Sequence, residues 1–307
     1  MSIALYTHHS CLEHDPGPGH PESPARLEAV LEALADPRFA ALKRVEAPRA
    51  TRAQLVRVHR AELLDEVLAR APQSGWRRLD PDTVMSPVSA EAALRAAGAV
   101  CAAVDAAIAG TNRRAFCAVR PPGHHATPST AMGFCLFNSI AVGAAHAIAA
   151  HCLERVAIVD FDVHHGNGTQ DIFWNDPRVL YVSSHQSPLY PGTGARTETG
   201  AGNIVNAPLP PGSGSADFRA VYEQTLLPAL ASFAPQLVMI SAGFDAHRLD
   251  PLANLNLETH DYAWITERLA GIAERHAAGR IVSSLEGGYN LTALRESVAA
   301  HLAALMT

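Results

Sequence analysis

The sequence predicts an α/β fold built on one central parallel sheet with helices on both faces. Short, continuously apolar segments rich in Val, Ile and Leu recur along the 307 residues, as strands buried on both faces do. Helical patterns lie between these segments, and this alternation is typical of parallel sheets. Because no linker, low-complexity tract or internal repeat interrupts the alternation, we predict one domain over residues 1–307.

The predicted strands and helices follow one another from the N-terminus to the C-terminus. Ser23 is the expected N-cap of the first helix, because Pro24 suits the first helical position. Gly110 is expected to end the long Ala-rich helix before it, and Asn290 to cap the last helix. The predicted strands are Ile3–Tyr6, Ala115–Val119, Val156–Phe161, Val179–Ser183, Leu237–Ser241 and Arg280–Leu285. The predicted helices are Pro24–Leu34, Ser89–Ala109, Ser139–Ala150, Ala216–Phe233, His260–Ala277 and Leu291–Leu305.

Composition narrows the class of protein. Hydrophobic residues make up 48% of the chain and charged residues 18%, which permits a sizeable buried core. The formal net charge is -6 and no Lys/Arg-rich run occurs, so neither nucleic acid nor a membrane is an expected partner. The five cysteines form no C-x-x-C pair, and no signal peptide or membrane-spanning run is evident. We therefore expect a cytoplasmic protein; its oligomeric state is left open.

Polar side chains gather directly after the predicted strands. In open parallel sheets, ligands bind beyond the carboxyl ends of the strands, so these segments are where a site is expected. They carry His, Asp and Tyr among Gly and Pro residues, and they read RPPGHHA, DFDVHHGNGT, HQSPLYPGTG, AGFDAHRLDP and EGGYN.

Asp162, His164 and Asp245 form a candidate metal site. Asp162 and His164 are two residues apart, so an extended chain would place both side chains on one side. A lone D-x-H is more often a hydrogen-bonded loop, but Asp245 follows another strand and supplies a third ligand. Carboxylate and imidazole ligands suit catalytic Zn²⁺, although iron(II) also fits this set. Asp160 would orient a histidine, help to bind a structural cation, or cap a backbone turn.

Three further residues suit hydrolysis. His124 and His125 follow Pro121-Pro122-Gly123, a constrained loop that can turn both rings towards one pocket, where they would act as general base and acid. A bare His-His pair is otherwise more often a surface feature. Tyr289 follows two glycines, and its phenol is a candidate donor to a developing oxyanion, although a tyrosine near a helix start more often serves packing.

Taken together, these segments resemble the histone deacetylase family in its class II-like bacterial branch. The resemblance extends from about Gly19 to the C-terminus. It is carried by GHPESPARL, RPPGHHA, GFCLFNSIAV, DFDVHHGNGTQ, VSSHQSPLYPGTG, SAGFDAHRLDP and LEGGYNL. It implies the arginase/deacetylase α/β fold and a hydrolase that removes acetyl or other acyl groups from lysine side chains or similar amines.

The resemblance also implies individual roles. Asp162, His164 and Asp245 would bind one zinc ion per chain, and His125 would activate the water and later protonate the leaving amine. His124 would be its electrostatic partner, held by Asp160. Asn167 stands where class I relatives have an Asp, and a neutral partner would leave His125 less basic. Tyr289 would polarise the acyl carbonyl.

By the same resemblance, the substrate channel is lined by Gly133, Phe134 and Tyr190. A structural potassium ion is expected on Asp160, Asp162, His164 and Ser183. Relatives that cleave acetylpolyamines carry a Glu gatekeeper where this chain has Leu252, after Asp250-Pro251. An apolar residue offers nothing to a cationic polyamine, so acyl-lysine is favoured.

The sequence is also compatible with other functions. An acetylpolyamine amidohydrolase would use the same machinery. A ureohydrolase of the arginase type would need two adjacent manganese ions, and His165 stands where a further carboxylate is wanted. A non-catalytic binding protein on the same fold is the alternative from another class. It is disfavoured because every position expected to bind metal or catalyse hydrolysis carries a suitable residue.

Overall fold

The computed structural model describes residues 3–307, which form one α/β domain around a parallel sheet. The strand order in this eight-stranded sheet is β2-β1-β5-β10-β9-β6-β7-β8, and all neighbouring pairs are parallel. Its strands are β1 (Ile3–Thr7), β2 (Lys43–Glu46), β5 (Arg114–Cys117), β6 (Val156–Asp160), β7 (Val179–Gln186), β8 (Ile204–Leu209), β9 (Leu237–Ala242) and β10 (Ile281–Leu285). A separate antiparallel pair is formed by β3 (Arg77–Arg78) and β4 (Val84–Met85).

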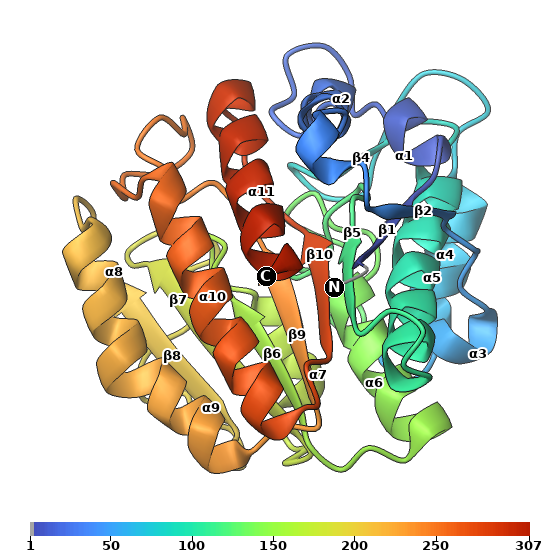
Figure 1. The fold of residues 1–307 in the computed structure, drawn as a ribbon. Helices are drawn as coiled ribbons and strands as arrows, with labels where there is room; N and C mark the ends of the chain where they lie inside the picture. The colour runs from blue at the N-terminus through green and yellow to red at the C-terminus, as the bar shows by residue number, and fades with distance from the viewer. Residues whose placement is uncertain (1–2) are drawn as a thin grey trace.

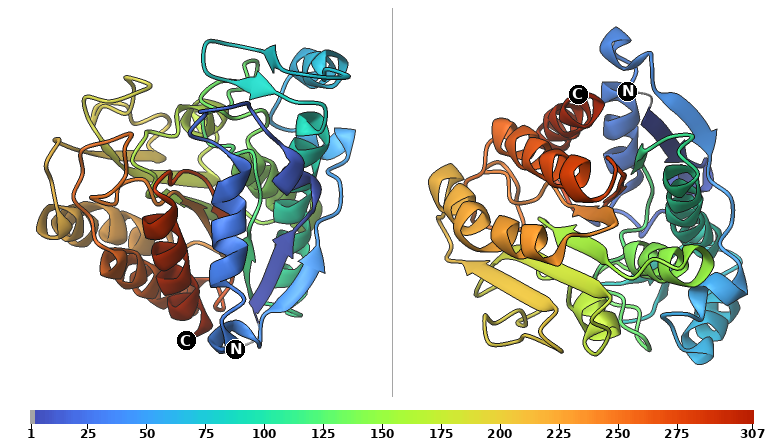
Figure 2. Two further views of the ribbon diagram at one scale, coloured as in Figure 1. Left: turned by 90° about the horizontal axis from the view of Figure 1, so that it is seen from above. Right: turned by 60° about the horizontal axis from the view of Figure 1, so that its bottom comes forward.

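Helices cover both faces of the sheet, with α8 to α11 on one side and α5 to α7 on the other (Figures 1 and 2). The helices are α1 (Ser10–Glu13), α2 (Pro24–Ala33), α3 (Arg52–Leu55), α4 (Ala61–Arg70), α5 (Ser89–Ile108), α6 (Ser139–His151), α7 (Asn167–Phe173), α8 (Ser215–Val221), α9 (Leu227–Phe233), α10 (Thr259–His276) and α11 (Leu291–Met306). A short 3₁₀ turn, η1 (Pro37–Phe39), and a π-helical turn, η2 (Tyr222–Leu226), complete the chain.

The predicted fold class is confirmed, and the central strands lie close to their predicted positions. Every residue of β5, β6, β9 and β10 is buried, which explains why apolar residues predominate in them. β2 and β8 were not predicted. Both are edge strands, and Lys43–Glu46 is mostly exposed, so its sequence carries charge instead of an apolar run.

Helix ends agree in part with their predicted caps. The side chain of Asn290 accepts a hydrogen bond from the Ala293 amide at 3.0 Å, as expected of an N-cap. Ser23 stands at the N-cap of α2, but its side chain makes no capping bond. The helix predicted over Ala216–Phe233 is divided by the π-helical turn η2. Pro228 follows this turn and cannot donate to a carbonyl one turn back, which accounts for the break in the regular pattern.

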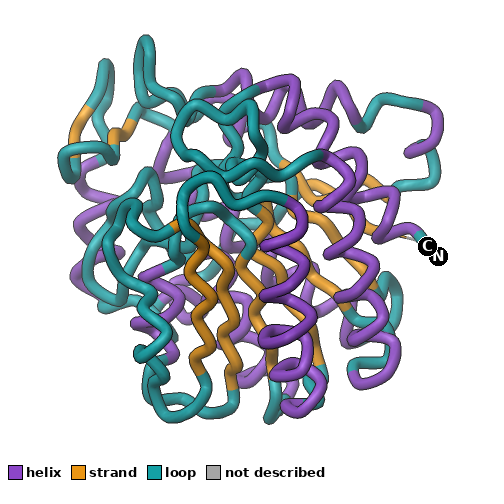
Figure 3. Tube along the Cα trace, turned by 90° about the vertical axis from the view of Figure 1, so that its left-hand side faces the viewer, coloured by secondary structure: helices purple, strands orange, loops and turns teal. Residues whose placement is uncertain are grey.

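Long loops follow the carboxyl ends of the strands and gather along that side of the sheet (Figure 3). Because all eight strands run the same way, the loop after every strand begins on this side. Within residues 3–307, no helix is both long enough and apolar enough to cross a membrane.

Candidate active site

Five adjacent strands bring the predicted site residues together. The loop after β5 carries the His pair, the loop after its neighbour β10 carries Tyr289, and the loop after β9 carries Asp245. Next in the sheet, the loop after β6 carries Asp162 and His164, and the loop after β7 carries Tyr190. Residues that are more than a hundred positions apart in the chain are therefore neighbours in space. A parallel sheet achieves this because its neighbouring strands end at the same edge.

Asp162, His164 and Asp245 are all buried, and one ligand atom from each lies within 4.8 Å of the others. The Nδ1 atom of His164 is 3.1 Å from Asp162 Oδ1 and 3.1 Å from Asp245 Oδ2. β6 ends at Asp160, so Asp162 and His164 converge from a bend. The prediction that both side chains lie on one side is met through this bend and not through the extended segment from which it was argued. Amide donors fix the carboxylates: Gly287 N donates to Asp162 at 2.8 Å, and Val163 N donates to Asp245 at 2.8 Å.

The donor set fits a divalent cation. Burial raises the pKa of Asp245 to about 7, and the Asp162 carboxylate adds to this effect. Two buried carboxylates this close repel each other, and a divalent cation between them would relieve the repulsion. A Cβ atom at Gly287 would overlap both carboxylates, so only glycine lets this loop close over them. Two carboxylates and one imidazole are ligands that catalytic Zn²⁺ accepts.

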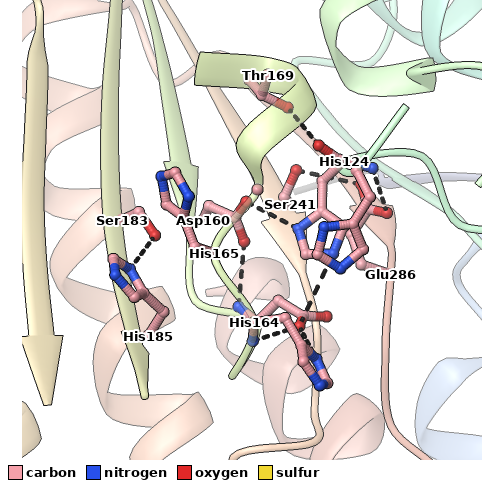
Figure 4. Close-up of polar contacts among 12 residues, drawn as sticks. His124, Asp160, His164, His165, Thr169, Ser183, His185, Ser241 and Glu286 are labelled. Carbon is pink, nitrogen blue, oxygen red and sulfur yellow. Dashed lines mark hydrogen bonds and ion pairs between the residues drawn. The ribbon is translucent and has the colours of Figure 1, made fainter. Parts of the chain in front are cut away.

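His124 lies beside Asp160 and Glu286, next to the metal-type group (Figure 4). Its Nδ1 atom is 3.0 Å from Asp160 Oδ2, and its backbone amide donates to Glu286. Burial alone would lower the pKa of His124, but the Asp160 and Asp162 carboxylates raise it to about 10. The ring is therefore a cation at neutral pH.

His125 is in the opposite state. Burial lowers the pKa of His125 well below its usual range, and the neighbouring His124 and His164 rings lower it further. Its Nδ1 atom is 2.8 Å from Asn167 Oδ1, so Nδ1 carries the proton and Nε2 is free to accept one. The two rings lie 4.0 Å apart between centroids. The predicted pairings of His124 with Asp160 and of His125 with Asn167 are both present.

A cavity of about 240 Å³ opens onto the His125 and His164 rings. The predicted residues Gly133, Phe134, Tyr190 and Leu252 all line it, together with Tyr289. Tyr190 is partly exposed, and its ring contacts that of His125 edge-on at 5.1 Å. Burial raises the pKa of Tyr289 well above its usual range, so its phenol keeps the proton that a donor needs.

Of the residues expected to hold potassium, Asp162 and His164 belong to the metal-type group itself, Asp160 ends β6, and Ser183 lies within β7. Asp160 and Ser183 are register partners in these neighbouring strands. Both side chains have other contacts: Tyr181 OH donates to Asp160 at 3.0 Å, and Ser183 Oγ is 2.9 Å from His185 Nδ1. The potassium site stays a prediction.

Four residues of the site were not singled out from the sequence. Asp82 and Leu189 line the cavity. The Glu286 carboxylate accepts from Gly123 N at 2.6 Å and so holds the loop that carries the His pair. Arg26 donates to the Glu286 and Gly288 carbonyls, and its guanidinium lies 4.8 Å from the centre of the Tyr289 ring. Because these contacts join loops distant in the chain, no local pattern indicates them.

His165 does not belong to the ligand group. Its ring contacts Thr193 Oγ1 at 2.7 Å and Gln170 Oε1 at 3.1 Å. Among the described residues, three side chains form the metal-type group in this pocket. A ureohydrolase with two adjacent metal ions would need further carboxylates here.

Together, fold and site define a hydrolase built on a parallel α/β sheet, and comparisons with known proteins identify the family. The histone deacetylase domain model matches residues 20–305, so the chain belongs to the histone deacetylase family. It is 38% identical to histone deacetylase 14, chloroplastic, of Arabidopsis thaliana, over 98% of this chain and 76% of the relative. It is 41% identical to a histone deacetylase-like amidohydrolase of Pseudomonas aeruginosa, over 89% of this chain and 73% of the relative.

A solved structure agrees with this assignment. The crystal structure of the HDA15 HD domain superposes with a TM-score of 0.94 at 37% identity, and it covers 99% of this chain and 88% of that one. Family membership supports deacetylase-type hydrolysis as the activity of this chain.

Proposed function

We propose that this protein is a zinc-dependent deacylase that removes acetyl or other acyl groups from lysine side chains. The observation that carries the proposal is the joint placement of a metal-type ligand group, a neutral His125 and a protonated Tyr289 at one narrow cavity. Each is a separate requirement of amide hydrolysis: polarisation of the carbonyl, removal of a proton from water, and stabilisation of an oxyanion.

The protein side chains would divide the chemistry as follows. When bound, Zn²⁺ would supply a Lewis acid that polarises the carbonyl and makes water more acidic. Neutral His125 takes the proton from the attacking water and later passes it to the leaving amine. Cationic His124 stabilises the negative charge that develops, while Tyr289 donates a hydrogen bond to the carbonyl oxygen. Cleavage of the amide bond then gives a carboxylate and a free amine.

The cavity wall supports an acyl-lysine substrate. Phe134, Tyr190, Leu189 and Leu252 offer apolar surface to the four methylene groups of a lysine side chain. Leu252 carries no charge with which to hold a second ammonium group. The apolar wall also excludes water from the reacting amide, which strengthens the hydrogen bonds made to it.

A turnover assay on a fluorogenic acetyl-lysine peptide, with and without a chelator, tests this proposal. We expect activity that the chelator abolishes and zinc restores. Tyr289→Phe should lower kcat roughly 10²- to 10³-fold with unchanged metal content, because it removes one oxyanion donor. His125→Ala should lower kcat at least as much.

The matched control is His260→Ala, since His260 is an exposed histidine on α10. This variant should keep full activity. Full activity in Tyr289→Phe or His125→Ala would overturn the assigned roles, and no turnover of any acylated amine by the zinc-loaded protein would favour a binding protein.

A second candidate function, acetylpolyamine hydrolysis, is favoured by Asp82. This carboxylate lines the cavity, and one of its oxygens already accepts from Gly133 N and Thr83 Oγ1. A carboxylate on the cavity wall would attract the ammonium groups of a polyamine. Comparing kcat/KM for acetyl-lysine peptides, longer acyl-lysines and acetylated polyamines would decide between the two substrates.

A further inference from the structure

A second group of metal-type side chains lies near the amino ends of the strands, away from the candidate active site at their carboxyl ends. Asp105 stands in the last turn of α5, and His146 and His151 in the last two turns of α6. Both helices end where the chain turns back to enter a strand of the sheet (Figure 1). The group therefore lies near the amino ends of β5 and β6, while the candidate active site lies beyond their carboxyl ends.

The two imidazoles converge on a single oxygen. His146 Nε2 is 2.7 Å and His151 Nε2 is 2.6 Å from the same Asp105 Oδ1 atom. The planes of the two rings stand almost perpendicular, at 88°, with their centroids 5.7 Å apart. One ligand atom from each of the three residues lies within 4.8 Å of the others, as in the candidate active site.

The surroundings suit an exchangeable cation. The side chain of Asp105 is 53% exposed and that of His151 is 24% exposed, whereas His146 is 9% exposed. Solvent can therefore reach the group from one side and complete a coordination shell. Both α5 and α6 present their carboxyl-terminal ends here, and the partial negative charge of a helix end favours a cation.

We propose that Asp105, His146 and His151 form a second metal site, which binds a divalent first-row transition metal such as Zn²⁺ and ties the end of α5 to the end of α6. Two imidazoles and one carboxylate are a ligand set that Zn²⁺ accepts with a water in the fourth position. This site is independent of the proposed deacylase activity, because none of its residues lines the catalytic cavity.

Arg57 should weaken metal binding at this site, because its hydrogen bond to His146 fixes which ring nitrogen carries the proton. Arg57 Nη1 lies 2.8 Å from His146 Nδ1, where it donates a hydrogen bond. A metal on Nε2 moves the ring proton to Nδ1, which then needs an acceptor. Arg57 offers only donors, so metal binding must displace its exposed side chain into solvent. Substituting Arg57 with a residue that accepts a hydrogen bond should therefore tighten metal binding.

Metal stoichiometry tests the proposal. The zinc-loaded protein is titrated with zinc sulfate, passed over a desalting column and analysed for bound zinc, while calorimetry gives the affinity. We expect wild-type protein to bind one zinc more per chain than His151→Ala or Asp105→Ala. Cobalt(II) added to the zinc-loaded protein should give visible absorption bands that both variants lack. Turnover should be unchanged in these variants.

The matched control is His9→Ala. His9 forms a surface pair with Glu13 at 3.5 Å, and the adjacent His8 is paired elsewhere, with Glu46 at 3.4 Å, so the His9→Ala variant should keep the additional zinc. Arg57→Gln should bind the additional zinc roughly tenfold more tightly, because Gln can accept from Nδ1–H. Equal zinc content in wild type, His151→Ala and Asp105→Ala overturns the proposal. So does additional zinc that is lost equally from His9→Ala.

Discussion

Two adjacent histidines take opposite protonation states because their partners differ in charge. His124 faces the Asp160 carboxylate at 3.0 Å, whereas His125 faces the neutral amide of Asn167 at 2.8 Å. The positive charge on His124 then lowers the pKa of His125 further. One residue is thereby fixed as a cation and its neighbour as a base, which is the division of labour that amide hydrolysis requires.

Leu252 offers the sharpest test of substrate choice. We expect Leu252→Glu to raise the kcat/KM for an acetylated polyamine, relative to an acetyl-lysine peptide, by about tenfold. The physical reason is that a carboxylate on the cavity wall attracts the distal ammonium groups of a polyamine. The ratio of the two kcat/KM values is the measured quantity, because it cancels any general loss of activity.

Leu249→Glu is the matched control, since Leu249 is 43% exposed on the same loop and does not line the cavity. Its ratio should stay at the wild-type value. If both variants shifted the ratio equally, the effect would come from general surface charge and not from the cavity wall.

Sequence patterns indicated the candidate metal ligands and catalytic residues of the site, but not the residues that position them. Asp162, His164 and His125 stand in compact motifs directly after strands, so the rule that ligands bind at strand ends finds them. Glu286 acts through a hydrogen bond to Gly123, which is 163 positions away in the chain. Asp82 reaches the cavity from a loop before α5. Only the three-dimensional fold brings these partners together.

At the scale of elements, burial decided which strands were predictable. β9 and β10 lie inside the sheet with every residue buried, so their sequences are mostly apolar and carry no charge. The edge strand β8 contains Asn206 and Pro208 and was not predicted. α7 begins at Asn167, inside a motif rich in glycine, and its helical pattern is hidden there.

Two helical glycines should respond to alanine in opposite ways. In α5, a Cβ atom at Gly98 would overlap the backbone of Pro48 and Ala50, which cannot move aside. In α10, a Cβ atom at Gly271 would meet only Arg275 Nη1, at 3.5 Å. We therefore expect Gly98→Ala to destabilise the protein by about 2 kcal/mol. Gly271→Ala should stabilise it by roughly 0.5–1 kcal/mol, since alanine is the better helix former.

Urea denaturation of both variants beside wild type measures these differences in unfolding free energy. Each variant serves as the other's control, because both make the same chemical change inside a helix. Destabilisation of both by equal amounts would contradict the packing argument for Gly98.

At the scale of the whole molecule, several histidines are buried and hydrogen-bonded without a carboxylate partner. Burial lowers the pKa of His59 to about 4 and that of His301 to about 3. Such residues are neutral in the folded protein but become protonated in the unfolded chain below about pH 6.5. The fold should consequently lose stability in mild acid, by proton uptake on unfolding.

His301 allows this linkage to be measured away from the candidate active site. Its ring nitrogens contact Thr266 Oγ1 at 2.6 Å and Ser283 Oγ at 2.9 Å, and the residue is fully buried. Because its folded pKa lies below its unfolded pKa, its contribution to stability is complete above about pH 6.5. That contribution is lost as the pH falls from there towards 3. His301→Gln keeps polar contacts at this position but removes the titrating group.

Between pH 7 and pH 5, wild-type protein should therefore lose about 2 kcal/mol more unfolding free energy than His301→Gln does. Urea denaturation at both pH values gives the two losses, and their difference cancels the packing cost of the substitution as well as the titration of all other groups. His260→Gln is the control, because His260 is exposed on α10 and should behave as wild type. Equal losses in wild type and His301→Gln would mean that the buried ring accepts a proton in the folded state without penalty.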